Sequence, residues 1–190
     1  MKSPVLAATL LASALLSGQD FKVGSRVANF AVLDMSGKAV MFDDLKGPVT
    51  VVTFISVQCP VSNAYNDRMN DIYKEYSARN VHFIFVNANS TESAAEVARH
   101  ARAVGFAFPV YKDPNNVVAD RFGATVTPES YVIDRSGIVR YHGQVDDSRN
   151  PARVTKQTLR MALDEVLAGK PVAIQETKAF GCSIKRVHKT

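Results

Sequence analysis

The sequence lacks the features that are typical of several common classes of protein. Among 190 residues there are only two cysteines, Cys59 and Cys182, and no tryptophan. Two cysteines exclude a disulfide-rich scaffold and a cysteine-rich zinc site. The net charge is a modest +5, and the basic residues are spread out apart from the short end Lys185–Lys189. Because nucleic-acid binding needs a clustered basic stripe, no nucleic-acid partner is expected.

The N-terminal apolar run, Val5–Leu16, is too short to cross a bilayer comfortably. It follows one lysine and precedes small and polar residues, which is typical of a secretory signal peptide, here assigned to residues 1–18. A retained N-terminal anchor or a core helix is the alternative interpretation. A cleaved signal would place the mature protein in the periplasm or outside the cell, without a membrane span and in an oxidising environment.

What the sequence does contain is enough apolar residues, 46% of the chain, for one compact core. From residue 21 onward, strand-like and helix-like segments alternate. The expected strands are a hairpin over residues 28–42, buried strands over 48–57 and 81–87, and a second hairpin over 130–143. The expected helices begin at Pro60, Ser93 and Asn150, with a short one ending at Gly123. This order predicts an α/β domain over residues 21–169, with helices on both faces of the sheet, and a mobile tail over 170–190.

A candidate reactive site lies in the segment FISVQCPVSN, where a buried strand ends and a helix begins. Cys59 stands at this junction, Pro60 opens the helix, and Ser62 follows one turn later. Free N–H groups and the helix dipole at such an end stabilise a thiolate. The Ser62 hydroxyl is a further candidate donor to the sulfur. The alternative is that Cys59 is a small buried apolar residue without chemistry.

The segment from Val23 to Asn63, together with GATVTPESYVIDRSGIVRYHGQVDD, resembles the redoxin group of the thioredoxin-like superfamily. That group includes the AhpC/TSA peroxiredoxins and thioredoxin-like thiol oxidoreductases. The resemblance covers roughly residues 23–167, and the ending GCSIK is similar to a peroxiredoxin-like subgroup. It implies a thioredoxin-like three-layer fold with a central mixed sheet and an N-terminal β-hairpin. The implied partners are protein or small-molecule thiols and disulfides, peroxides, and an external reductant, with no cofactor and no metal.

The resemblance also implies roles for single residues. Cys59 matches the nucleophilic cysteine of thioredoxins, whereas Ser62 replaces the resolving cysteine and Thr53 replaces a buried aspartate. Thr127 and Pro128 match a dipeptide whose proline is cis and whose backbone faces the active sulfur. The catalytic set is therefore Cys59, Cys182, Ser62 and Pro128, and the residues expected to border the substrate are Thr127, Pro60 and Ser56.

A thiol peroxidase is the alternative activity. Peroxiredoxins carry Pro-x-x-x-Thr-x-x-Cys and a distant arginine. Here Ser56 can stand in for the threonine, but Val52 occupies the proline position and no arginine lies near Thr127 in the sequence. Because the peroxide transition state needs such donors, disulfide exchange is the favoured activity.

Cys182 leaves three interpretations open. It can act as a distal resolving thiol for Cys59, form a permanent structural bridge with Cys59, or pair with nothing. A different class of function, a non-catalytic binding module or copper(I) chaperone, would need one of the histidines to join the two sulfurs.

Overall fold

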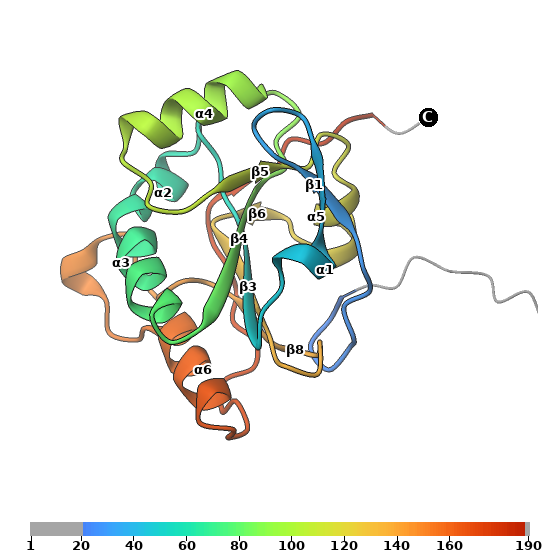
Figure 1. Cartoon of the computed structure of the whole chain (residues 1–190). Coiled ribbons are helices and arrows are strands. Elements are labelled where there is room, and N and C mark those ends of the chain that lie inside the picture. Colours follow the sequence, from blue (N-terminus) through green and yellow to red (C-terminus); the bar gives the residue numbers. More distant parts are fainter. Residues whose placement is uncertain (1–20, 189–190) are drawn as a thin grey trace, which may run out of the picture.

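A computed structural model describes residues 21–188 of the chain (Figure 1). The predicted signal peptide over residues 1–18 lies outside the described part. Within residues 21–188, no helix has both the length and the hydropathy needed to span a membrane.

The described chain folds around one seven-stranded mixed sheet in the order β2-β1-β5-β4-β3-β7-β8, and a separate two-stranded sheet joins β6 to β9. The strands are β1 (Ala31–Leu33), β2 (Ala39–Met41), β3 (Val49–Phe54), β4 (Val81–Asn87), β5 (Val110–Lys112), β6 (Val126–Thr127), β7 (Glu129–Ile133), β8 (Val139–Gly143) and β9 (Cys182–Ser183). The helices are α1 (Phe42–Leu45), α2 (Pro60–Asn63), α3 (Asn66–Ser77), α4 (Ala94–Ala103), α5 (Val117–Phe122) and α6 (Thr158–Leu167).

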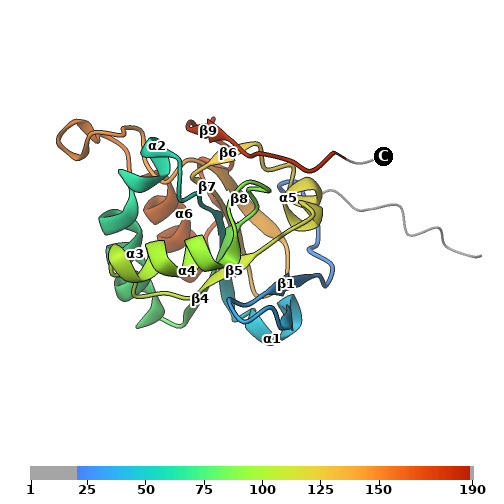
Figure 2. The ribbon, with the colours of Figure 1, turned by 90° about the horizontal axis from the view of Figure 1, so that it is seen from above.

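The central strand β3 separates two apolar cores. Its side chains alternate, so that Val49 and Val51 join the core beneath α3, α4 and α6, while Val52 and Phe54 join the core beneath α1 and α5. Figure 2 shows these two sets of helices on opposite sides of the sheet. Strand β3 pairs with β4 in parallel and with β7 in antiparallel orientation. The predicted thioredoxin-like three-layer fold and its N-terminal hairpin, β1–β2, are therefore confirmed.

Two helices differ from the prediction: one is interrupted and the other begins later in the chain. The helix that starts at Pro60 is interrupted after Asn63, and α3 begins at Asn66, although Tyr65 and Tyr76 are buried as the helical spacing predicted. The last helix begins at Thr158 rather than at Asn150. Asn150 instead caps a 3-10 turn over Pro151–Arg153, because its side-chain oxygen accepts from the N–H of Ala152.

The described residues of the tail pack against the domain, in contrast to the featureless segment that the sequence suggested. Val172 and Ile184 are both 6% exposed and join the two cores. Strand β9 pairs antiparallel with β6, with Cys182 opposite Thr127 and Ser183 opposite Val126. Figure 2 shows β9 alongside β6. Sequence reasoning treated this segment as featureless because its partners lie far away in the chain and its only regular structure is two residues long.

Candidate thiol site

Cys59 occupies the junction that the sequence predicted, after β3 and before α2. It is the N-cap residue of α2, with Pro60 as the first helical residue, and its side chain is only 2% exposed. Its sulfur accepts a hydrogen bond from the N–H of Ser62 at 3.2 Å. The sequence therefore places a buried sulfur against the free N–H groups that a helix start supplies.

The surroundings of Cys59 favour its thiolate. Burial acts most strongly and raises the pKa of the Cys59 thiol, but hydrogen bonds from the Cys182 thiol and from the Ser62 N–H outweigh it, so the pKa is lowered overall. The backbone N–H of Cys182 also donates to the Cys59 sulfur, at 3.4 Å. When Cys59 is protonated, its thiol can donate to the carbonyl oxygen of Thr127, also 3.4 Å away.

Cys182 differs from Cys59 in both exposure and acidity. It is partly exposed, and its hydrogen bond to Cys59, followed by burial, raises the pKa of its thiol. Both cysteines are free. The two opposite shifts favour ionisation of Cys59 before Cys182, which is the order expected of a nucleophile and a resolving thiol.

The Ser62 hydroxyl does not take the predicted place beside the sulfur. Its oxygen accepts a hydrogen bond from the N–H of Ser56 at 3.1 Å, so Ser62 assists Cys59 through its backbone. Thr53, which replaces the buried aspartate of thioredoxins, lies 2.9 Å from Ser130 through their hydroxyl oxygens. Thr53 and Ser130 thus satisfy each other's hydroxyl groups, and no charge is buried at this position.

A buried carboxylate, Glu92, holds the loop that carries Cys59. Its two oxygens accept hydrogen bonds from the Ser56 hydroxyl at 2.6 Å and from the N–H groups of Val57 and Gln58, both at 2.9 Å. Ser56 connects Glu92 to Cys59, because the Ser56 hydroxyl oxygen also accepts a hydrogen bond from the N–H of Cys59 at 3.1 Å. Burial raises the pKa of Glu92, but the hydrogen bonds from Ser56 and Val57 bring it below its ordinary value.

Glu92 belongs to a polar cluster at the carboxyl ends of the parallel strands β4 and β5. The ammonium group of Lys112, 6% exposed, donates to the backbone oxygens of Asn89 and Glu92 and to the side chain of Asn87. Asn87 in turn donates to Glu92 at 2.5 Å. Sequence reasoning missed this cluster, although the polar residues that follow two buried apolar strands were a usable signal.

A second buried carboxylate, Glu129, supports the backbone facing the sulfur. It accepts hydrogen bonds from the N–H groups of Thr125 and Val126 and from His142, whose ring stacks on Tyr131. Between these groups the Thr127–Pro128 peptide bond is cis, as the resemblance implied. Thus Glu92 orders the loop on one side of the sulfur, and Glu129 orders the strand on the other.

Within residues 21–188, no histidine joins the two sulfurs as the copper interpretation required. Among the described residues there is no group of three or more histidine, cysteine, aspartate or glutamate side chains placed to hold a metal ion. His142 is paired with Glu129 instead, and His82 lies 3.0 Å from the carbonyl oxygen of Leu45.

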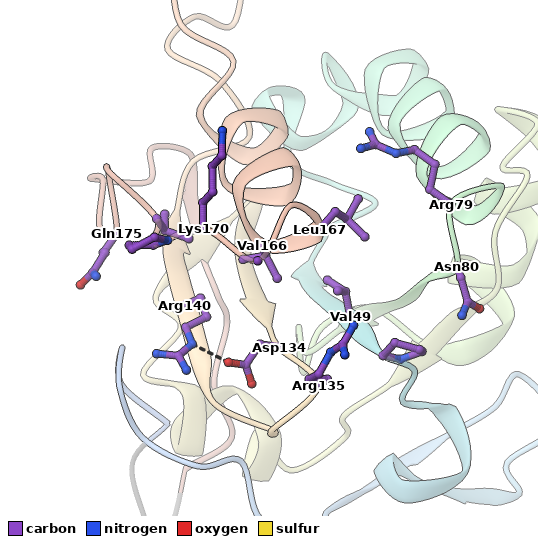
Figure 3. A pocket seen from close by; sticks show the side chains of 14 residues that line it. Val49, Arg79, Asn80, Asp134, Arg135, Arg140, Val166, Leu167, Lys170 and Gln175 are labelled. Carbon is purple, nitrogen blue, oxygen red and sulfur yellow. Dashed lines mark hydrogen bonds and ion pairs between the residues drawn. The ribbon is translucent and has the colours of Figure 1, made fainter.

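A cavity of about 520 Å³ lies far from this site, where β3 and β4 begin rather than where they end (Figure 3). It is lined by Arg79, Arg140 and Lys170 among others, but by no cysteine or histidine. Arg140 pairs with Asp134, as Figure 3 shows, and Arg79 pairs with Asp164. The cavity therefore offers nothing to the chemistry of Cys59.

The three-layer fold, and a sulfur at a strand end facing a cis-proline, define the thioredoxin-like class of proteins. Residues 23–142 match the AhpC/TSA family, and the chain belongs to that family. It is 29% identical over 121 residues to the thiol-disulfide oxidoreductase ResA of Bacillus thuringiensis (strain Al Hakam), which covers 64% of this chain and 69% of the relative. The predicted oxidoreductase class agrees with the name of this relative.

Solved structures resemble a larger share of the chain than ResA does. A crystal structure of an uncharacterized conserved protein from Geobacillus kaustophilus is 31% identical and superposes with a TM-score of 0.82, over 90% of this chain and 95% of the other. The peroxidoxin BcpB of Mycobacterium tuberculosis is 21% identical, with a TM-score of 0.56 over 78% of this chain and 95% of the other. At that identity the peroxidoxin shares the fold alone.

Proposed function

We propose that this protein is a redoxin-type thiol–disulfide oxidoreductase in which Cys59 is the nucleophile and Cys182 is the resolving thiol. One observation carries the proposal: Cys182 lies against the buried Cys59, and its backbone N–H donates to the Cys59 sulfur at 3.4 Å. The conventional position for a resolving cysteine, three residues after the nucleophile, is occupied by Ser62. The tail supplies the second thiol that the helix lacks.

The first step of the proposed reaction forms a mixed disulfide. The Cys59 thiolate attacks one sulfur of a substrate disulfide, the substrate S–S bond breaks, and one half leaves as a thiolate. The hydrogen bond from the N–H of Ser62 holds the attacking sulfur in place until its charge is lost. Pro60, Thr127 and Pro128 border this sulfur and limit the direction from which the substrate approaches.

The second step releases the product. Cys182 loses its proton to solvent and attacks the Cys59 sulfur, which expels the second half of the substrate as a thiolate and leaves a Cys59–Cys182 bridge. The substrate has gained two electrons and the protein has lost two. An external dithiol, or two thiols in succession, must then reduce the bridge. Run in reverse, the same steps oxidise a dithiol partner.

The contacts of Ser56 support disulfide exchange over peroxide reduction. In the peroxiredoxin pattern this hydroxyl would assist the bound peroxide. Here it donates to Glu92 at 2.6 Å and accepts from the N–H of Cys59. The Ser56 hydroxyl proton therefore already bonds to Glu92, and a bound peroxide would have to compete with this buried carboxylate for the hydrogen bond.

The proposed setting of this chemistry follows from the N-terminal segment. We infer that residues 1–18 direct export and that the working unit is the domain over residues 21–169 with the tail over 170–190 attached to it. Periplasmic or extracellular placement would let a Cys59–Cys182 bridge persist between reactions.

The stoichiometry of a single turnover tests the proposal. Reduced protein is mixed with excess of a small aromatic disulfide whose released thiol absorbs light. The wild type should release two thiols per chain and retain no reagent, because both sulfurs end in one internal bridge. Cys182→Ser should release one thiol and keep half of the reagent on Cys59. A wild type that carries two reagent groups by mass spectrometry would contradict the proposal.

A further inference from the structure

The tail occupies the strip of backbone that a substrate chain would need in order to approach Cys59. Cys182 lies opposite Thr127 in the β6–β9 pairing, and the N–H of Ile184 donates to the carbonyl oxygen of Thr125 at 2.9 Å. With the tail in place, Cys59 is only 2% exposed. No extended chain can therefore reach this sulfur while the tail stays paired.

The contacts continue beyond β9 and are made largely through backbone atoms. The N–H of Lys185 donates to the side chain of Asn89 at 2.7 Å, and its carbonyl oxygen accepts from the N–H of Ser90 at 2.8 Å. The N–H of Val187 donates to the side chain of Asn116 at 2.8 Å. Because most of these bonds recognise a peptide backbone, another extended chain could make them equally well.

Three positions of the tail have side-chain requirements of their own. A Cβ atom on Gly181 would overlap the carbonyl oxygen of Thr127, so this position admits no side chain. Ile184 is 6% exposed within the core beneath α5. Arg186 pairs with Asp120 at 3.0 Å. Between them, Ser183 and Lys185 are exposed to solvent. Cys182 and Ile184 thus face the domain while Ser183 and Lys185 face solvent, which is the alternation of an extended chain lying on a surface.

We propose that residues 181–187 act as a built-in substitute for a substrate segment on this strip of backbone and that their side-chain requirements set which partner segments bind there. The competing ligand is an extended, cysteine-bearing segment of a partner protein. It has glycine before the cysteine, an aliphatic residue two positions after it, and a basic residue two positions further on. The partner segment displaces the tail to reach Cys59, and the tail returns with Cys182 when the partner leaves. The inference deepens the proposed function, because it states which disulfide partners Cys59 meets.

Protection of Cys59 from alkylation tests the site without requiring any disulfide exchange. The full-length Cys182→Ser protein is treated with iodoacetamide, and the rate reports how often the tail opens. Adding Gly181→Ala should raise the rate on the order of tenfold, because the pairing with Thr127 is broken and the sulfur is exposed more often. Ser183→Ala, with an exposed side chain on the same strand, is the matched control and should leave the rate unchanged.

Synthetic peptides then test recognition. The peptide Phe-Gly-Ser-Ser-Ile-Lys-Arg-Val, which copies residues 180–187 with serine for cysteine, should restore protection to the Gly181→Ala protein. The same peptide with alanine for glycine, or with aspartate for isoleucine, should not. If Gly181→Ala does not fold, Ile184→Ala in the same Cys182→Ser chain carries the same expectations.

Two results would overturn the inference: an unchanged alkylation rate in the loosened tail, or equal protection by all three peptides. Neither result depends on the release of two thiols per chain. If the chain does not release two thiols but the tail and peptides still protect Cys59, only the proposed function is wrong. If the chain releases two thiols but the tail and peptides do not protect Cys59, only the peptide site is wrong.

Discussion

The backbone N–H of Cys182 donates to the sulfur of Cys59 across 123 positions of chain, at 3.4 Å. The Cys182 side chain also lowers the pKa of the Cys59 thiol. One tail residue therefore favours the Cys59 thiolate through both its backbone and its side chain, in addition to carrying the thiol proposed to complete the reaction. Stabilisation of the nucleophile and resolution of the mixed disulfide would thus depend on the same two-residue strand.

The first prediction concerns the acidity of Cys59. In Cys182→Ser a hydroxyl can still donate to the sulfur, whereas in Cys182→Ala only the backbone N–H groups remain. The pH midpoint of Cys59 alkylation should lie below the unperturbed value of about 8.5 in Cys182→Ser and be higher in Cys182→Ala. Rates of iodoacetamide labelling across pH measure both midpoints. Equal midpoints in the two variants would show that the tail side chain has no part in ionising Cys59.

The second prediction concerns Glu92. Glu92→Gln replaces one of two acceptor oxygens by an amide donor that faces the donors of Ser56, Val57 and Gln58. It also removes a negative charge near Lys112. The free energy of unfolding should fall by roughly 2–4 kcal/mol. Urea denaturation measures this change. Glu176→Gln, at an exposed position, is the control and should change little.

Glu92 should also make the free energy of unfolding depend on pH in the acidic range. Its pKa in the folded protein is depressed, so the unfolded chain binds the proton more readily. The stabilisation is complete above the unfolded value of about 4.3 and is lost as the pH falls through the folded value. Glu92→Gln should therefore lose less stability than the wild type on acidification. A parallel loss in both proteins would assign the acid sensitivity to other carboxylates.

The third prediction separates disulfide exchange from peroxide reduction. Stopped-flow mixing of the reduced protein with hydrogen peroxide should show slow oxidation of Cys59, because the Ser56 hydroxyl donates to Glu92 rather than to a bound peroxide. A small disulfide should react much faster under the same conditions. Cys59→Ser serves as the control for both reagents. Rapid peroxide consumption that disappears in Cys59→Ser would reverse the assignment.

The sequence was most informative where the signal is local. A β-branched apolar run followed by Cys59 and Pro60 predicts a strand, a buried sulfur and a helix start, because each depends on neighbouring residues. The tail shows the opposite case. Gly181 indicated flexibility, yet the structure uses its missing side chain for close contact with Thr127. That distinction requires knowing which distant segment lies opposite.

Glu92 was missed for a related reason. A glutamate among asparagine and serine residues suggests an exposed loop, and only the parallel pairing of β3 with β4 and of β4 with β5 brings Asn87, Glu92 and Lys112 beneath the Cys59 loop. Likewise, the interruption after Asn63 is not evident from the continuous helical spacing of Tyr65 and Tyr76. Tertiary contacts decide these points, and their residues lie tens of positions apart.

The most direct measurement follows the two sulfurs through one turnover. A protein disulfide substrate is mixed with reduced enzyme, the reaction is quenched with acid at successive times, and the linked peptides are identified by mass spectrometry. The account predicts that a mixed disulfide on Cys59 appears first and decays as a Cys59–Cys182 peptide pair accumulates, while Cys182→Ser stops at the mixed disulfide. A wild-type protein that also stops there, with Cys182 still free, would contradict the account.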